Sequence, residues 1–497
     1  MTSGNNLRVG AVLSYIGIGC SIVSGVLLTP LILRSLGQSE YGVYHMAAAL
    51  LGYIALLDFG FSEVVSRYVA RYQIRRQEAA QANFLGHCCL LYGCAVLLVA
   101  VVGLTVWRLI PTLFGHTLSP VELDTMQRVF LILLLNFAVV LPFSAFPSLL
   151  TAYEAFLFSR SLHLVLIFLR FGATVFFLGR GMGVYGLLLV EILLDAFLIV
   201  VQGIYLFGVL KIRIRLYRLD RGLLRQMLIF GFFLFLSSLV GRLQWQLGNM
   251  LLGALKSPTA VALLSLALQP VSYFRVLSGV VAGLSLPRAV QAAEQDSSPE
   301  ALTGFMVRVG RIQLMICGFL FIGFVCVGDT FLRLWAGSEY QGAYPICLIL
   351  MGAFILPSCL TTGVYLLEAK NRHRRRAVIT LILAIVGIVP SVLLIIRLGS
   401  IGAAMGTALS LLACNLVATG VELKRQLSIR MTRFYRALFR GILPVLLACG
   451  LLGVLLRSLL PHNAAGMLAL AGILTLFYLP SLWFLGLTPA ERRQMRW

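Results

Sequence analysis

Charged side chains are scarce in this sequence of 497 residues, since Asp, Glu, Lys and Arg together make up only 12% of it. Apolar residues make up 60%, and the mean hydropathy is +0.96. A water-soluble domain of this length could not carry such a composition without a very large exposed apolar surface. The composition therefore excludes a large soluble domain and indicates that the chain lies in a bilayer.

Motifs for catalysis and metal binding are also missing from the sequence. Its ten cysteines form no Cys-x-x-Cys pair, its six histidines are scattered, and it contains no P-loop, Rossmann fingerprint or nucleophile elbow. We therefore predict no catalytic residues, no metal site and no cofactor, and we do not expect an enzyme.

Apolar runs of about 20 residues, the length that crosses roughly 30 Å of hydrocarbon as a helix, recur from one end of the chain to the other. They predict an all-α polytopic membrane protein with about fourteen transmembrane helices. The predicted helices lie near residues 10–36, 42–69, 83–106, 126–150, 160–179, 184–210, 223–255, 260–287, 305–328, 343–367, 377–397, 400–423, 440–458 and 465–487.

The basic residues gather in short segments between these runs. The richest segments are KIRIRLYRLDR (211–221), KNRHRRR (370–376) and LKRQLSIRMTRFYR (423–436). The positive-inside rule places them, and both termini, on the cytoplasmic side of the membrane. Topology and attraction to anionic membrane lipids thus account for the formal charge of +22. We do not expect nucleic acid as a partner, since no motif that recognises it accompanies these segments.

The two halves of the chain repeat weakly. GVYGLLLVEILLDAF (183–197) aligns with GSIGAAMGTALSLLA (399–413), each with Gly-x-x-Gly at the start of a predicted helix. An even number of helices per half predicts two lobes of parallel topology. We expect an N-lobe of helices 1–6 (1–210), a basic cytoplasmic inter-lobe loop (211–222), a C-lobe of helices 7–12 (223–430), and a segment (431–497) with helices 13–14 and a short basic tail.

Two neighbouring predicted helices each carry a polar stripe that includes an arginine. The stripes are Ser238, Arg242, Gln246 and Asn249 on the seventh helix, and Ser265, Gln269, Ser272 and Arg275 on the eighth. Intramembrane arginines are costly, by roughly 2.5–3.5 kcal/mol at the centre of a helix, and commonly face a cavity or a partner. We predict that the Arg, Gln and Asn residues of both stripes bind a ligand, the alternative being that each arginine caps a carbonyl or snorkels.

Acidic residues offer candidates for ion coupling. Asp58 lies near the middle of the second predicted helix and can pair with an arginine or bind a coupling cation, which makes a proton or sodium gradient a candidate energy source. Glu63 and Arg67 stand i,i+4 on the same helix, where they can neutralise each other. We interpret the Glu63–Arg67 pair mainly as a structural ion pair.

Glu191 and Asp195 lie on one face of the sixth predicted helix. Two neighbouring carboxylates resist full ionisation and can share a proton, which would suit proton coupling. Pairing with an arginine such as Arg170 is an equally good interpretation, so both remain open at the level of the sequence.

Three segments resemble the signature segments of Wzx-type O-antigen and polysaccharide flippases in the MOP superfamily. They are LILRSLGQSEYGVY (31–44), LLDFGFSEVVSRYVARY (56–72) and GSIGAAMGTALSLL (399–412). The resemblance implies an alternating-access transporter of the bacterial inner membrane that moves undecaprenyl-diphosphate-linked oligosaccharide repeat units, for O-antigen, capsule or exopolysaccharide. It also implies contacts with membrane lipids and with a polysaccharide polymerase and chain-length machinery.

The same resemblance assigns roles to particular residues. In relatives, helices one, two, seven and eight line the cavity, and cationic side chains there engage the diphosphate. At matching positions this places Arg242 and Arg275 on the headgroup and Asp58 at the helix-two site, with Arg67 as a further member. An arginine fork can hold phosphate in a bidentate manner, so the chemistry of the residues agrees with these roles.

Three other classes of protein compete with this interpretation. A lipid II flippase also has fourteen helices and a cationic cavity. A MATE-type multidrug or cation antiporter would bind organic cations, which the two arginines would repel, and it commonly depends on a carboxylate in the first helix, where this chain has none. A polymerase or ligase of the same glycolipids would be expected to have a large outside loop, whereas the longest predicted one (107–124) is short.

Overall fold

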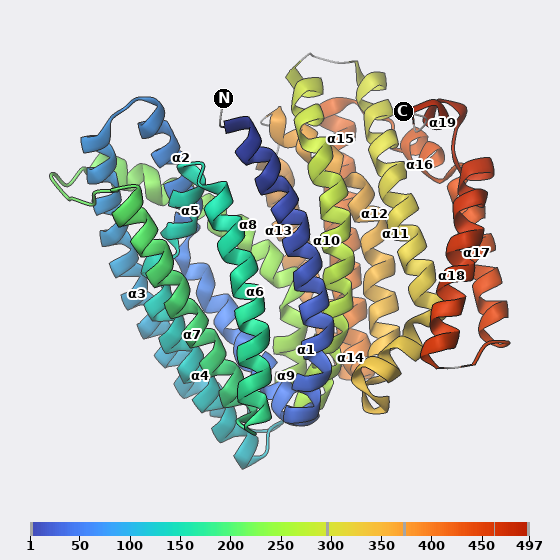
Figure 1. The fold of residues 1–497 in the computed structure, drawn as a ribbon, viewed down its shortest axis with the longest axis horizontal. Coiled ribbons are helices and arrows are strands. Elements are labelled where there is room, and N and C mark those ends of the chain that lie inside the picture. The colour runs from blue at the N-terminus through green and yellow to red at the C-terminus, as the bar shows by residue number, and fades with distance from the viewer. Residues whose placement is uncertain (1–2, 295–297, 371–373, 462, 495–497) are drawn as a thin grey trace. The chain divides into compact units, whose positions relative to one another are not determined.

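The computed structural model describes residues 3–294, 298–370, 374–461 and 463–494, and all secondary structure in these ranges is helical (Figure 1). Residues 371–373 of one basic loop and residues 495–497 of the basic tail lie outside the described residues. Among the described residues, eleven helices are long and apolar enough to cross a membrane, or up to twelve if a bent pair counts as one span. The prediction of an all-α polytopic membrane protein is confirmed.

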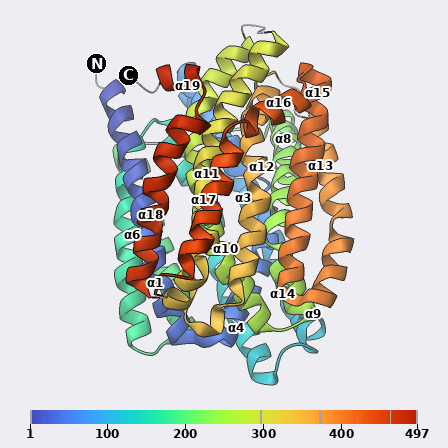
Figure 2. The same ribbon diagram turned by 90° about the vertical axis from the view of Figure 1, so that its right-hand side faces the viewer.

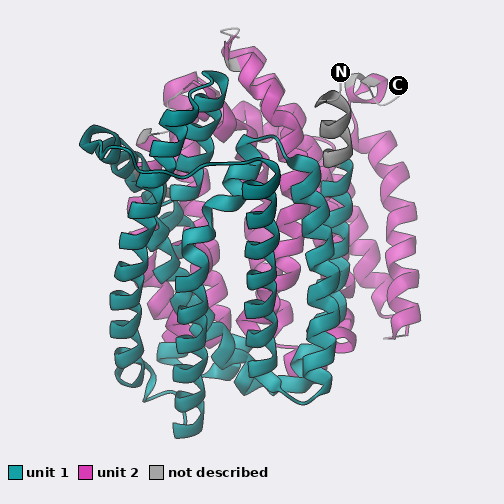
Figure 3. Cartoon of the chain, turned by 60° about the vertical axis from the view of Figure 1, so that its left-hand side comes forward, with its two compact units in different colours: residues 1–242, 253–262 teal, residues 243–252, 263–497 magenta. Residues whose placement is uncertain are grey.

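Contacts between Cα atoms group the chain into two compact units (Figure 3): residues 1–242 with 253–262 form unit 1, and residues 243–252 with 263–497 form unit 2. Short α-helical and 3₁₀ pieces interrupt several long helices of unit 1. Its elements are α1 (Ser3–Ile54), η1 (Ala55–Asp58), α2 (Phe61–Ile74), α3 (Glu78–Phe114), α4 (Pro120–Val140), η2 (Leu141–Phe143), α5 (Ala145–Ala152), α6 (Phe156–Gly179), α7 (Gly183–Ile204), η3 (Tyr205–Val209) and most of α8 (Arg221–Trp245).

Unit 2 contains the remaining long helices and a group of short helices at one end, where α15, α16 and α19 lie (Figures 1 and 2). Its elements are part of α9 (Leu247–Leu255), most of α10 (Pro258–Glu294), α11 (Pro299–Ala336), η4 (Ser338–Tyr340), α12 (Ala343–Ala369), α13 (Arg374–Val386), α14 (Ile388–Leu412), η5 (Ala413–Thr419), α15 (Gly420–Leu427), α16 (Met431–Phe439), α17 (Ile442–Arg457), α18 (Ala464–Ser481), η6 (Leu482–Gly486) and α19 (Pro489–Gln494). The contacts divide the chain near residue 242, so the predicted lobe boundary at 211–222 stays a prediction.

Two candidate spans are far longer than a membrane crossing requires, since Val12–Ile74 has 63 residues and Arg375–Leu427 has 53. A glycine with a positive φ turns the chain inside each: Gly37 (φ 71°) in α1 and Gly399 (φ 60°) in α14. Glycine adopts such angles without steric cost. Both turns fall where one predicted helix ends and the next begins, but the predicted number of fourteen helices is not confirmed.

Two helices that the sequence predicts as continuous are broken in the structure. The predicted helix 42–69 passes through the 3₁₀ turn η1 and then through Phe59 (φ 50°) and Gly60 (φ 65°) before α2 begins. The predicted helix 223–255 is interrupted at Gln246, which separates α8 from α9. The apolar pattern runs through both breaks, which is why it could not locate them. Asp58 and Gln246 therefore lie at interruptions of helices.

Apolar side chains cover much of the outward surface of the spans. Leu97 and Val101 on α3 are 68% and 64% exposed, and Leu468 and Leu476 on α18 are 67% and 75% exposed. Hydrocarbon is as apolar as leucine, so such exposure carries no penalty in a bilayer. Inside unit 2, α11 packs against α12, α17 and α18, and the Tyr478 hydroxyl donates a hydrogen bond of 2.9 Å to the Met315 carbonyl.

The glycines of the aligned repeat segments have matching backbone roles. Gly183 (φ 51°) begins α7, and Gly399 (φ 60°) opens the helical run at the corresponding position of the second half. Three residues further on, a Cβ at Gly402 would collide with the backbone of Leu394. A Cβ at Gly406 would lie 2.8 Å from Cα of Ser391. Gly402 and Gly406 thus let two helical segments approach closely, as the Gly-x-x-x-Gly spacing predicts.

Replacing either close-packed glycine by alanine will destabilise the protein. We expect Gly402→Ala and Gly406→Ala to lower the free energy of unfolding by about 1–3 kcal/mol, because the added methyl group forces the backbones apart. The measurement is the thermal midpoint of the purified protein in detergent. Gly279→Ala on α10 is the control, since a Cβ there meets nothing within 4 Å. Equal midpoints for all three variants would contradict the packing role.

Candidate functional site

Arg275 on α10 lies against aromatic rings instead of a carboxylate. Its guanidinium carbon is 3.8 Å from the centroid of the Trp245 ring and 5.9 Å from that of Phe354. The two rings meet edge to face at 6.4 Å, which fixes the plane on which the cation rests. A cation over an aromatic face is stabilised by about 2 kcal/mol when it is desolvated. All three residues belong to unit 2.

Three buried polar acceptors of unit 2 have no partner in the described part of the chain: one at the break between α8 and α9, one on α9 and one on α10. Oε1 of Gln246, Oδ1 of Asn249 and Oγ of Ser265 accept no hydrogen bond from the described residues. Leaving a buried polar atom unpaired costs roughly 1–3 kcal/mol, so such atoms commonly have a ligand or water as their partner. On α10, the backbone carbonyl of Gln269 accepts a hydrogen bond of 2.7 Å from the Ser272 hydroxyl.

Arg242 lies in the last turn of α8, in unit 1. Its backbone carbonyl accepts a hydrogen bond of 3.5 Å from the Tyr53 hydroxyl on α1, which ties α8 to the first helix. Its half-buried side chain forms no ion pair with the described residues. The structure therefore leaves both predicted arginines without an acidic partner among the residues that it describes.

Asp58 ends η1 just before the left-handed turn at Phe59 and Gly60. The hydroxyls of Ser62 and Ser144 lie close to its carboxyl group, but Oδ1 is buried and accepts no hydrogen bond from the described residues. In the described ranges no cationic side chain pairs with it either. Asp58 is thus a carboxylate at a break in a candidate span, without an ion-pair partner in the described ranges.

Arg67 on α2 does not pair with Glu63 within the part of the chain that the structure describes, although their spacing allows it. Its guanidinium carbon lies 5.0 Å from the centroid of the Phe230 ring. Arg67, Tyr68, Arg71 and Phe230 line a cavity of about 250 Å³ within unit 1. The predicted Glu63–Arg67 pair is therefore wrong for this structure, and Arg67 faces a cavity.

Glu191 and Asp195 on α7 have separate partners. Arg170 on α6 holds both carboxylate oxygens of Glu191, at 2.6 and 3.0 Å, while Oδ2 of Asp195 accepts a hydrogen bond of 2.7 Å from Nδ2 of Asn136. These contacts favour pairing with Arg170 over a proton shared by the two carboxylates. Ion coupling through this pair has no support in the geometry of unit 1.

The predicted site residues fall in both units: Asp58, Arg67, Glu191, Asp195 and Arg242 in unit 1, and Gln246, Asn249, Gln269 and Arg275 in unit 2. One cavity lined by residues of both groups remains a prediction. The sequence argument missed the aromatic rings next to two of the arginines: Trp245 and Phe354 at Arg275, and Phe230 at Arg67. Only Trp245 had a signal in the sequence, because it directly precedes Gln246 of the polar stripe.

The contact between Arg170 and Glu191 predicts a coupled response to mutation. Arg170→Gln leaves a carboxylate uncompensated inside a membrane span, so we expect it to lower the thermal midpoint and the membrane abundance. Glu191→Gln in addition should restore both, with a coupling free energy of about 1 kcal/mol. A double-mutant cycle on purified protein measures it. Additive effects, with transport lost in every variant that lacks Glu191, would instead support a role in ion coupling.

Comparison with known proteins identifies a family and several solved structures of similar fold. A family model described as "Polysaccharide biosynthesis protein" matches residues 9–293. The uncharacterized membrane protein EpsK of Bacillus subtilis (strain 168) is 22% identical over 421 residues, which cover 82% of this chain and 80% of EpsK. Among solved structures, the lipid II flippase MurJ in an inward closed conformation has a TM-score of 0.70 at 14% identity, over 95% of this chain and 98% of MurJ.

An inward-facing MATE multidrug resistance transporter of the MOP superfamily has a TM-score of 0.62 at 16% identity, over 86% of this chain and 98% of that chain. Identities this low show a shared fold only. The family description names polysaccharide biosynthesis, and these solved structures of similar fold are a flippase and a transporter. This chain belongs to the polysaccharide biosynthesis protein family and has the fold of the MOP superfamily, as the resemblance of its signature segments predicts.

Proposed function

We propose that this protein is an alternating-access flippase that moves undecaprenyl-diphosphate-linked oligosaccharide repeat units across the bacterial inner membrane, with both termini in the cytoplasm. The family and the fold support a lipid-linked substrate within a multi-pass membrane protein. A polysaccharide polymerase and chain-length machinery would then receive the flipped unit. The Lys- and Arg-rich segments support the proposed orientation through the positive-inside rule.

The observation that carries this proposal is the setting of Arg275. Because its planar face rests on Trp245 and no carboxylate pairs with it in the described part of the chain, the N–H groups along its edge stay available to an incoming anion. Guanidinium binds phosphate through two parallel hydrogen bonds. A diphosphate headgroup supplies enough acceptor oxygens for Arg275 and for a second arginine, a role we assign to Arg242.

The unpartnered acceptors suit the sugar part of the same substrate. Gln246, Asn249 and Ser265 present oxygen atoms that lack hydrogen-bond donors among the described residues. Sugar hydroxyls are donors, and a site built to pair with hydroxyls disfavours ligands that lack them. An organic cation would gain nothing from these oxygens that offsets repulsion by the arginines, so the proposal disfavours a MATE-type function.

Arg242→Ala and Arg275→Ala should each abolish or strongly reduce export. Losing one charge-assisted hydrogen-bonding partner costs about 1.5–3 kcal/mol, or roughly 10- to 150-fold in affinity. The measurement is accumulation of lipid-linked oligosaccharide on the cytoplasmic face after deletion of the gene, with rescue by each variant at matched membrane abundance. Arg397→Ala, an exposed arginine of α14, is the control and should rescue fully. Full rescue by both test variants would exclude the headgroup assignment.

A lipid II flippase is the second candidate, favoured by the extensive structural similarity to MurJ. The same deletion separates the two candidates, because each predicts a different lipid-linked intermediate on the cytoplasmic face. An accumulated oligosaccharide repeat unit supports the first candidate. Accumulated lipid II, with an unchanged level of other lipid-linked glycans, supports the second.

We further propose that Asp58 couples transport to a proton or sodium gradient, since its buried Oδ1 lacks a donor in the described ranges. In proteoliposomes, Asp58→Asn should abolish stimulation of transport by an imposed pH or sodium gradient, because an amide neither ionises nor binds these cations well. Glu63→Gln, the exposed neighbouring carboxylate on α2, should leave the stimulation unchanged. A gradient response in Asp58→Asn equal to that of the wild type would contradict the proposal.

A further inference from the structure

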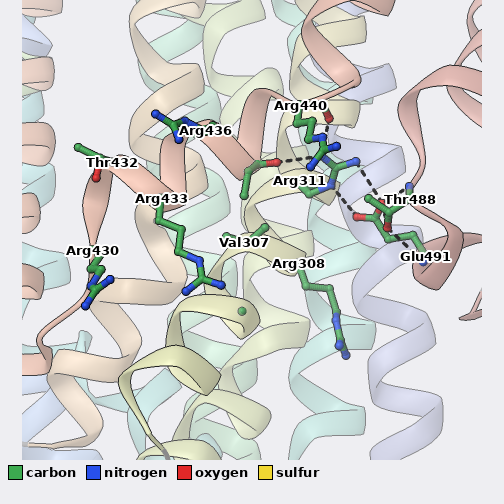
Figure 4. A pocket seen from close by; sticks show the side chains of 12 residues that line it. Val307, Arg308, Arg311, Arg430, Thr432, Arg433, Arg436, Arg440, Thr488 and Glu491 are labelled. Carbon is green, nitrogen blue, oxygen red and sulfur yellow. Dashed lines mark hydrogen bonds and ion pairs between the residues drawn. The ribbon is translucent and has the colours of Figure 1, made fainter.

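Unit 2 contains a large basic cavity, about 930 Å³ in volume, at the end where α15, α16 and α19 lie (Figures 2 and 4). We call it the arginine pocket. Six arginines and a single acidic residue contribute to its lining, with small and polar residues between them. They are Arg308, Arg311, Arg430, Arg433, Arg436, Arg440 and Glu491. Neither the polar stripes nor the proposed transport mechanism uses any of these residues.

Arg311 and Glu491 form the structural wall of the arginine pocket. Arg311 is buried and uses all of its N–H groups: Glu491 accepts at 2.6 and 3.1 Å, and the carbonyls of Ala437, Arg440 and Gly486 accept at 3.0, 2.7 and 2.7 Å. Burial alone would raise the pKa of Glu491, but hydrogen bonds from Arg311 and Thr488 outweigh it and lower that pKa. This pair joins α11, α16 and the segment after η6, and it cancels the one negative charge of the lining.

The other five arginines of the lining are exposed, and no acidic side chain pairs with them within the described ranges. Figure 4 shows that Arg430, Arg433 and Arg436 extend from α16 and the residue before it, while Arg308 comes from α11. Like charges held around one cavity repel each other, by about 1 kcal/mol per pair at 4 Å even in water. An anion with several negative charges would relieve this repulsion.

The setting of α16 indicates where that anion comes from. Phe434 and Leu438 are fully buried on one side of this helix, whereas Thr432, Arg433 and Arg436 are exposed on the other. The helix follows the span that ends at Leu427 and is bent by 44° from α17, which leads back into an apolar run. The apolar side of α16 packs on α11, and because α16 connects the end of one span to the next apolar run, it lies near the membrane surface, where phospholipid headgroups are found.

We propose that the arginine pocket binds the headgroup of an anionic phospholipid that carries two phosphate groups. Arginine is suited to this task because its donor fork matches phosphate, and basic pockets between membrane helices bind such headgroups. Five available guanidinium groups exceed what a single phosphodiester can satisfy, and the volume accommodates a second phosphate. This site is independent of the transported substrate, so it stands even if the proposed transport function is wrong.

The experiment titrates the purified full-length protein in detergent with cardiolipin, phosphatidylglycerol or phosphatidylcholine, and counts bound lipids by native mass spectrometry. We expect cardiolipin to bind most tightly. Arg433→Gln with Arg436→Gln should weaken its binding by about tenfold or more, because charge-assisted hydrogen bonds are lost. The matched control is Arg213→Gln with Arg215→Gln, which removes the same charge from an exposed segment of unit 1 and should keep wild-type binding.

Three results would overturn the proposal. Equal weakening by both double variants would indicate general attraction to a basic protein, and equal binding of the three lipids would exclude recognition of two phosphates. Binding of inorganic diphosphate as tight as that of cardiolipin, lost in the same variant, would identify a site for a soluble anion. If the Arg433→Gln, Arg436→Gln variant is not monodisperse, two other variants replace it. Arg308→Gln on α11 should weaken cardiolipin binding. The charge-preserving variant Arg433→Lys with Arg436→Lys should retain most of the binding.

Discussion

Hydrocarbon forms no hydrogen bonds, and the architecture of this protein follows from that constraint. Each backbone group that crosses the bilayer must find its partner within the protein, so all described secondary structure is helical. Non-helical backbone at membrane depth is tolerated only where protein buries it or where it lines a water-filled cavity. The breaks at Phe59–Gly60 and at Gln246 each lie at or near a buried side-chain oxygen that has no partner among the described residues, on Asp58 and on Gln246 and Asn249.

The same constraint acts on charge and separates two kinds of intramembrane arginine. Arg170 and Arg457 are paired with Glu191 and Asp329, so each charge has a partner of opposite sign and each pair joins two helices. Arg67 and Arg275 rest on aromatic rings instead. The first arrangement stabilises the fold, and the second leaves a positive charge available. The absence of an acidic partner, more than position within a span, is therefore the basis on which we propose an arginine as a binding residue.

The sequence predicted the apolar spans because a segment enters the bilayer according to its apolar composition, and composition can be seen in the sequence. It also predicted the turns near Gly37 and Gly399, where loops interrupt the apolar runs. It missed the break at Gln246, because the residues on both sides continue the apolar pattern. Helix propensity is summed over many residues, so it does not detect a single non-helical residue between two helices. Periodicity correctly placed Ser265 and Gln269 on one helix, α10, but it wrongly joined Arg242 to Gln246, because α8 ends at Trp245. It could not show that Trp245 lies beneath Arg275, because that contact joins two helices.

The geometry of a guanidinium explains why its partner matters for function. Arg311 directs every N–H group toward an oxygen of the protein, so nothing remains for a ligand. Arg275 is stabilised through its face, and an aromatic ring occupies no N–H group. The ring therefore offsets part of the desolvation cost while the donors along the edge stay free. The proposed function requires the protein to bind an anionic headgroup and then release it, and a cation that does not depend on that anion for its stability permits both steps.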